Sequence, residues 1–175
     1  MSELPPELDD LVPIPILPRH PGWVNAYRQA WADLWRQRDV TEAAALLDDL
    51  WQRMGRPVGG AAREVQVPWS GPPLELIVLL LSQVIGVKWP GAGDALVWHL
   101  WEEPPVGVRN LRLAGNIVSL VAEAGEGGGI VVVVEARRPF DLEIETEFTT
   151  FSEQVPAGRT RYLLTYLDRT DVRQA

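Results

Sequence analysis

The residue types that could carry chemistry are few, because the chain has no cysteine and two histidines. His20 and His99 belong to no HExxH or HxH pattern. A catalytic zinc normally takes three protein ligands, so both histidines would need a carboxylate from a distant segment. We interpret His20 as the residue that enters the first predicted helix and His99 as a half-buried structural residue. We expect no metal site, no cofactor and no catalytic residue.

The familiar catalytic motifs are also missing from the sequence. No serine lies in a G-x-S-x-G motif, and no glycine-rich segment has the form of a phosphate-binding or dinucleotide-binding loop. The segment GEGGG, residues 125–129, lacks a following lysine and joins two strand-like runs. It therefore predicts a hairpin turn, and the sequence as a whole predicts a protein that is not an enzyme.

Four carboxylates alternate along one segment, as Asp141, Glu143, Glu145 and Glu147. Alternate residues on one face of a strand stand about 7 Å apart, which suits neither a cation shell nor a catalytic pair. We interpret the four as a solvent-facing column. Arg159 and Arg161 are its expected partners, because 140–151 and 159–168 are predicted to form an antiparallel hairpin.

Tryptophan is unusually frequent, with eight residues against three tyrosines and three phenylalanines. Four of the eight lie on helical stripes and are read as core residues or interface anchors. Carbohydrate-binding sandwiches use exposed aromatic platforms, so the remaining tryptophans are ligand candidates under that reading. They are Trp69, Trp89, Trp98 and Trp101.

The elements that must position these residues begin with an extended arm over 1–21. Six prolines in this segment oppose helix formation and favour extended backbone. Leu11, Ile14 and Ile16 make the arm apolar, so we expect it to lie along its own domain or a neighbouring subunit. They are interface candidates.

A helical hairpin is predicted over 22–56. Apolar residues recur at steps of three and four over 22–38 and again over 40–54. Trp23, Trp31 and Trp35 lie on the first stripe and are further interface candidates.

From residue 63 to 175 the period changes to two, which predicts a β-sandwich. Strands are expected at 95–102, 106–113, 116–123, 130–137 and in the two segments of the terminal hairpin. Residues 74–85 are ambiguous between helix and strand, and the strand-like sequence that follows favours a buried strand. The expected fold is mainly β, an antiparallel, jelly-roll-like sandwich preceded by the arm and the hairpin.

Charge and hydropathy limit the partners. The chain of 175 residues carries 16 basic and 24 acidic residues, a net charge of −8, which argues against nucleic acid. The longest apolar run, Leu76 to Leu81, is far shorter than the roughly 20 residues of a membrane helix. The acidic, proline-broken N-terminus is unlike a signal peptide. We expect no membrane span, and a cytoplasmic location unless the protein belongs to a virion.

Residues 151–163, FSEQVPAGRTRYL, resemble a segment of virion and adhesin sandwiches, in which a V-P-A-G-K/R-T turn leads into an apolar strand. The resemblance covers 13 of 175 residues. It implies a small single-jelly-roll structural protein of a bacterial virus, which assembles through arms and sheet edges without a cofactor. The helical hairpin departs from that pattern.

The function expected from the sequence is thus that of a non-enzymatic structural protein, a capsid or tail subunit that binds copies of itself and other structural subunits. The alternative is a carbohydrate-binding sandwich module, with an enzyme as a third reading. Exposed tryptophans beside a polar groove would favour the carbohydrate, and an intersubunit arm would favour assembly.

Overall fold

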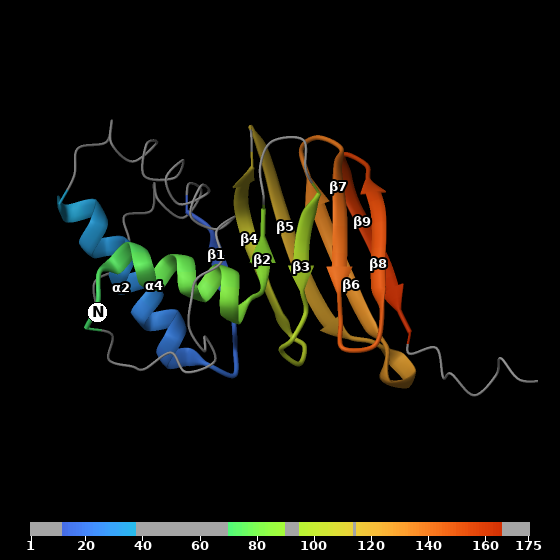
Figure 1. Ribbon diagram of the computed structural model, residues 1–175, viewed down its shortest axis with the longest axis horizontal. Coiled ribbons are helices and arrows are strands. Elements are labelled where there is room, and N and C mark those ends of the chain that lie inside the picture. Colours follow the sequence, from blue (N-terminus) through green and yellow to red (C-terminus); the bar gives the residue numbers. More distant parts are fainter. Residues whose placement is uncertain (1–11, 38–69, 90–94, 114, 166–175) are drawn as a thin grey trace, which may run out of the picture.

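The computed structural model describes residues 12–37, 70–89, 95–113 and 115–165. Two β-sheets pack face to face as a sandwich, and two helices lie beside them next to β1 and β2 (Figure 1). The fold expected from the sequence, a mainly β sandwich preceded by helical structure, is confirmed. The predicted helix over 40–54 and the alternating segment 63–69 lie outside the described residues.

The first sheet, sheet A, is antiparallel throughout, with the order β1-β4-β5-β6-β9. Its strands are β1 (Ile14–Ile16), β4 (Val106–Leu113), β5 (Asn116–Ala124), β6 (Ile130–Ala136) and β9 (Gly158–Leu164). The strands predicted at 106–113, 116–123 and 130–137 are therefore confirmed. The 3₁₀ turn η2 (Glu126–Gly128) joins β5 to β6 where the glycine-rich segment predicts a hairpin.

The second sheet, sheet B, has the order β2-β3-β7-β8. Its strands are β2 (Val87–Lys88), β3 (Leu96–His99), β7 (Phe140–Glu145) and β8 (Thr150–Val155). β3 and β7 run parallel, whereas the other pairs of this sheet are antiparallel. The sheet is therefore mixed, and it differs in this pairing from the fully antiparallel arrangement expected from the sequence.

Residues 74–85 are helical, so the predicted buried strand is wrong. The helix α4 (Pro73–Leu79) continues into the π-helical turn η1 (Leu80–Val84). Pro73 occupies the first turn, where its missing N–H costs no hydrogen bond. Beyond Leu74, the positions that are not buried are Glu75, Leu79 and Gln83, a spacing of four that marks one helical stripe.

The terminal hairpin predicted from 140–151 and 159–168 is also wrong. The chain turns back soon after Glu145, where Thr146 Oγ1 accepts from the amide of Thr149 at 3.0 Å. β7 therefore pairs with β8, while β9 pairs with β6 in the other sheet. Gly158, with φ +104°, begins β9 in a conformation that favours glycine, just after the chain crosses between the sheets.

The N-terminal arm is part of the sandwich. β1 pairs antiparallel with β4 and forms the edge of sheet A. Val12 and Leu17 are buried, whereas Ile14 and Ile16 are half-buried. The expected extended backbone is confirmed over 14–16, and Leu11 lies outside the described residues.

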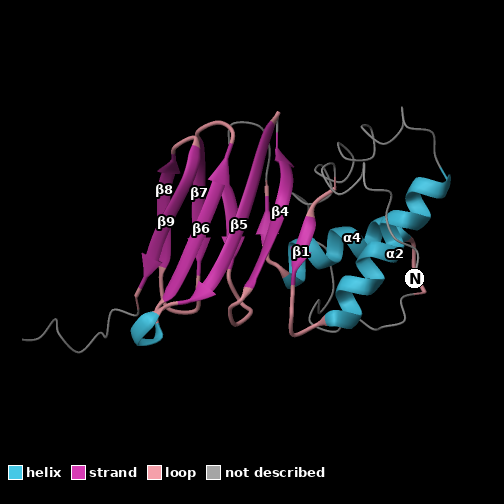
Figure 2. Cartoon of the chain, turned by 180° about the vertical axis from the view of Figure 1, so that it is seen from behind, coloured by secondary structure: helices cyan, strands magenta, loops and turns pink. Residues whose placement is uncertain are grey.

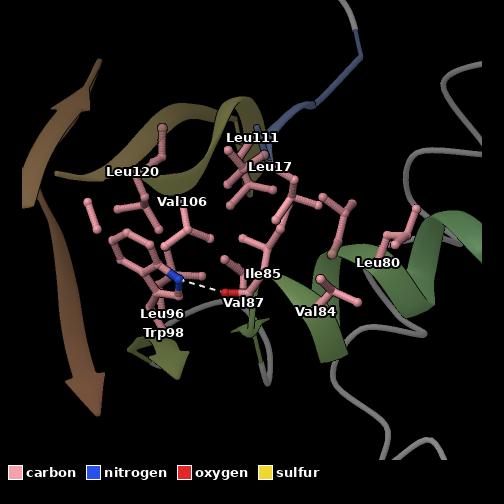
Figure 3. Packing of buried hydrophobic residues seen from close by; sticks show 14 of the residues in the cluster. Leu17, Leu80, Val84, Ile85, Val87, Leu96, Trp98, Val106, Leu111 and Leu120 are labelled. Atoms are coloured by element: carbon pink, nitrogen blue, oxygen red, sulfur yellow. Dashed lines mark hydrogen bonds between the residues drawn. The ribbon is translucent and has the colours of Figure 1, made fainter. Parts of the chain in front are cut away.

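The helices continue the core beyond the sheets. The 17-residue helix α2 (Pro21–Gln37) confirms the first predicted helix and packs against α4. In Figure 3, Ile85 and Val87 bring the end of the α4–η1 helix to Trp98 and to Val106 of the two sheets. Figure 2 shows both helices next to β1, at the opposite side from β9. The described helices are all too short and polar to cross a membrane.

Candidate binding faces of the sandwich

Each histidine lies between a carboxylate and a tryptophan. His99 Nδ1 is 2.5 Å from Glu145 Oε2, and the imidazole stacks on Trp101 with ring centroids 5.4 Å apart. His20 Nε2 is 3.4 Å from Glu102 Oε2, and its ring stacks on Trp23 at 3.9 Å. These pairings give both histidines structural contacts.

No group of three metal-ligating side chains gathers anywhere in the part of the chain that the structure describes. The ion pair between Arg19 and Glu103 joins the arm to the loop that follows β3, close in sequence to Glu102. The contacts of His20 and Arg19 therefore hold the start of α2 against that loop.

The three ligand candidates within the described residues differ in exposure. Trp98 is fully buried, and its Nε1 donates to the carbonyl of Ile85 at 2.8 Å, so it is a core residue and no ligand can reach it. Trp89 is half-buried and packs against the core. Trp101 is 54% exposed and presents its indole beside His99.

The interface candidates on α2 pack within the chain. Trp31 is buried and meets Tyr27 edge-on, with ring centroids 6.3 Å apart. Trp23 and Trp35 are half-buried and pack against the core. All three therefore contribute to the packing of α2 in the chain itself.

The outer face of sheet B carries the predicted carboxylate column. Leu142 and Ile144 are fully buried, so the alternating residues Asp141, Glu143 and Glu145 point away from the core. Their partners on β8 are the neutral residues Gln154, Ser152 and Thr150. Glu147 lies beyond the strand in the exposed turn. We call Asp141, Glu143 and Glu145 the acidic column.

The outer face of sheet A is predominantly basic. The residues on this face alternate with buried valines and leucines in each strand. Its charged members are the arginines Arg109, Arg112, Arg137, Arg159 and Arg161 and the glutamates Glu123 and Glu135. Arg159 and Arg161 therefore lie opposite Glu135 and Val133, in the other sheet from the acidic column that the sequence pairs them with. We call this surface the basic face.

A bulge explains why sequence periodicity misses part of the basic face. Arg109 and Arg112 are an odd number of residues apart, so a regular strand would place them on opposite sides. The register shifts between Val108 and Leu111, and Asn110 there has φ +58°. Asparagine tolerates this left-handed conformation better than most residues, which suits Asn110 to a place in the bulge.

The centre of the basic face is apolar and hollowed. Val121 and Val133 lie side by side in the register, and Leu163 on β9 is 62% exposed. Beside them is a hollow of about 390 Å³, whose polar lining comes from Asn110, Ser119, Glu135, Arg137 and Arg159. Arg159 Nε is 3.4 Å from Glu135 Oε1, with both side chains largely exposed.

Neither outer face is covered by α2 or α4. Figures 1 and 2 view the sandwich from opposite sides, and in both the described helices lie beside the strands next to β1 and β2. The sandwich thus presents two sheet surfaces of opposite charge.

No protein-family model, curated protein or solved structure matches the chain.

Proposed function

We propose that the protein is a non-enzymatic assembly protein that associates with copies of itself through the outer faces of its sandwich. The observation that carries the proposal is the opposite charge of those faces. Sheet A carries five arginines against two glutamates, and sheet B carries three carboxylates on β7 against Lys88 on β2. Complementary charge on two surfaces of one chain lets each copy bind the next.

The composition of the basic face also supports an interface. Protein interfaces combine an apolar centre with a polar rim, and arginine is enriched in them relative to lysine. Val121, Val133 and Leu163 supply the apolar part, with Arg161 beside Val133 and Arg159 one pair further along β9. The resemblance of 151–163 to virion sandwiches adds a setting, in which the chain is a capsid or tail subunit of a bacterial virus.

Sedimentation velocity of the full chain tests the proposal. We expect species larger than the monomer at about 100 µM protein and 0.1 M salt. Raising salt to 1 M shortens the Debye length from about 10 Å to about 3 Å and should shift the protein toward the monomer. A monomer throughout this concentration range at 0.1 M salt would contradict self-association.

A matched pair of substitutions separates the basic face from net charge. Arg161→Glu changes the basic face, and Arg28→Glu makes the same charge change on an exposed position of α2. We expect Arg161→Glu to weaken association at least tenfold and Arg28→Glu to leave it within about twofold. Equal effects of the two would mean that net charge alone governs association.

A carbohydrate is the second candidate partner, favoured by the exposure of Trp101. An indole that is 54% exposed and held parallel to His99, at an interplanar angle of 11°, provides an apolar platform. Glu145 and Glu143 provide hydrogen-bond acceptors on the same sheet face. Sugar rings bind proteins through this combination of an aromatic face and polar neighbours.

Affinity electrophoresis through gels that contain soluble polysaccharides tests this candidate. We expect retardation of the wild-type chain in at least one neutral polysaccharide and its loss in Trp101→Ala. Phe148→Ala, which removes another exposed aromatic ring, should keep the retardation. Unchanged migration of the wild-type chain across a panel of glucans, xylans and galactans would contradict carbohydrate binding.

A further inference from the structure

We infer that association is head-to-tail, with the acidic column of one copy on the basic face of the next, so that copies form an open stack; this inference rests on the proposed function. A dimer that pairs the same face from both copies would set arginines against arginines or carboxylates against carboxylates. Like charges across an interface oppose association. The charges therefore favour contact between unlike faces.

The spacing of charges on the two faces matches. Asp141, Glu143 and Glu145 are alternate residues of β7, and Arg159 and Arg161 are alternate residues of β9. Alternate residues of a strand are about 7 Å apart in both cases. Glu143 of one copy can consequently lie over Arg161 of the next, with a second carboxylate of the column two residues away.

The neighbouring strands extend the match to apolar residues. β3 lies beside β7 and places the half-buried Val97 next to Glu143 on the outer face. β6 lies beside β9 and places the half-buried Val133 next to Arg161. With β7 over β9 and β3 over β6, a contact of Glu143 with Arg161 also places Val97 over Val133.

The sheet order makes this contact an open one. Strands β1 and β2 lie at one side of the sandwich and β9 and β8 at the other (Figure 1). A second copy can therefore lie on sheet A of the first, displaced along the sheet normal with a small lateral shift. In this position its β7 lies toward β9 of the first copy and its β3 toward β6 of the first copy. Unlike contacts on opposite sides of a subunit leave a free face at each end, and such an interface extends into a stack.

A mixing experiment tests this arrangement with one variant per face. Arg161→Glu changes the basic face and Glu143→Arg changes the acidic column. We expect each variant alone to sediment as a monomer under conditions where the wild-type chain associates. An equimolar mixture should regain association, because each variant keeps one native face, and native mass spectrometry should find both variants in every complex.

The outcomes separate the two proposals. A wild-type chain that stays monomeric overturns the proposed function. A wild-type chain that associates while either variant also associates alone overturns the head-to-tail arrangement and leaves self-association standing. If Arg161→Glu abolishes binding of a labelled DNA duplex but leaves association intact, the basic face binds a polyanion. This result also overturns the head-to-tail arrangement.

Folding controls accompany both variants. Each substitution is made on an outer face, so thermal unfolding should remain cooperative and within a few degrees of the wild-type midpoint. Arg159→Glu and Asp141→Arg, at exposed positions on the same two strands, form a second pair that must reproduce the result.

Discussion

Two buried aromatic side chains satisfy backbone carbonyls that have no place in a sheet or helix ladder. The hydroxyl of Tyr27 in α2 donates to the carbonyl of Pro13 at 2.7 Å, just before β1. The indole of Trp98 donates to the carbonyl of Ile85 at 2.8 Å, just after η1 (Figure 3). A buried carbonyl without a partner is costly, so these side chains fix the path of the chain as well as filling the core.

Removing the Tyr27 hydroxyl tests this role. Tyr27→Phe leaves the buried Pro13 carbonyl without its donor, so we expect the free energy of unfolding at pH 7 to fall by about 1–3 kcal/mol in urea titrations. Burial raises the pKa of Tyr27 above its ordinary value of 10.0. The unfolded chain then loses this proton first, so the contribution of Tyr27 is complete below pH 10 and declines above it.

Unfolding of the wild type and of Tyr27→Phe at several pH values tests this pH dependence. The difference in unfolding free energy between wild type and Tyr27→Phe should shrink between pH 9 and pH 11. A difference that stays constant over this range would mean that the phenol titrates alike in the folded and unfolded chain.

At the scale of elements, alternation predicts strands well where one side faces the core and the other faces solvent. It places β4, β5 and β6 within a few residues of their bounds, and it correctly turns Asp141, Glu143 and Glu145 away from the core. It fails over 74–85, because that helix is buried on most sides and its sequence is apolar almost throughout. Such a run carries little periodicity by which a helix and a strand can be told apart.

The same alternation decides how much of the two binding faces can be predicted from the sequence. The acidic column follows from alternation within one strand, so the sequence is sufficient to predict it. The basic face depends on which strands become neighbours and on the bulge at Asn110, both of which are tertiary features. The predicted pairing of Arg159 and Arg161 with the acidic column is wrong, because the chain crosses between the sheets after Val155.

Two leucines test the helix over 73–84. Leu79 and Leu81 would share a face in a strand, whereas in the helix Leu81 is fully buried and Leu79 is half-buried. We expect Leu81→Ala to lower the free energy of unfolding by about 2–5 kcal/mol and Leu79→Ala by clearly less. Equal losses in urea unfolding would favour strand-like packing and contradict the helix.

At the scale of the whole molecule, the arm belongs to the sandwich of its own chain. β1 is the edge strand of sheet A, and Leu17 packs in the same cluster as Val106 and Ile85. The sequence also allows an arm that is exchanged between subunits. In that case β1 of a neighbouring copy would form the edge strand of sheet A. Self-association through the sheet faces needs no such exchange, so folding and assembly can be measured separately.

Substitutions in the arm test that separation. Leu17 is 3% exposed, so Leu17→Ala should cost about 2–5 kcal/mol in the free energy of unfolding. Ile14 is half-buried on the outer side of β1, so Ile14→Ala should lower the free energy of unfolding by less than Leu17→Ala. Because the arm docks on its own sandwich, the loss in Leu17→Ala should be the same at 1 µM and at 100 µM protein in 1 M salt, where face-to-face contacts are screened. A loss that changes with protein concentration under these conditions would mean that Leu17 packs on a neighbouring copy, and the arm would then be an intersubunit element.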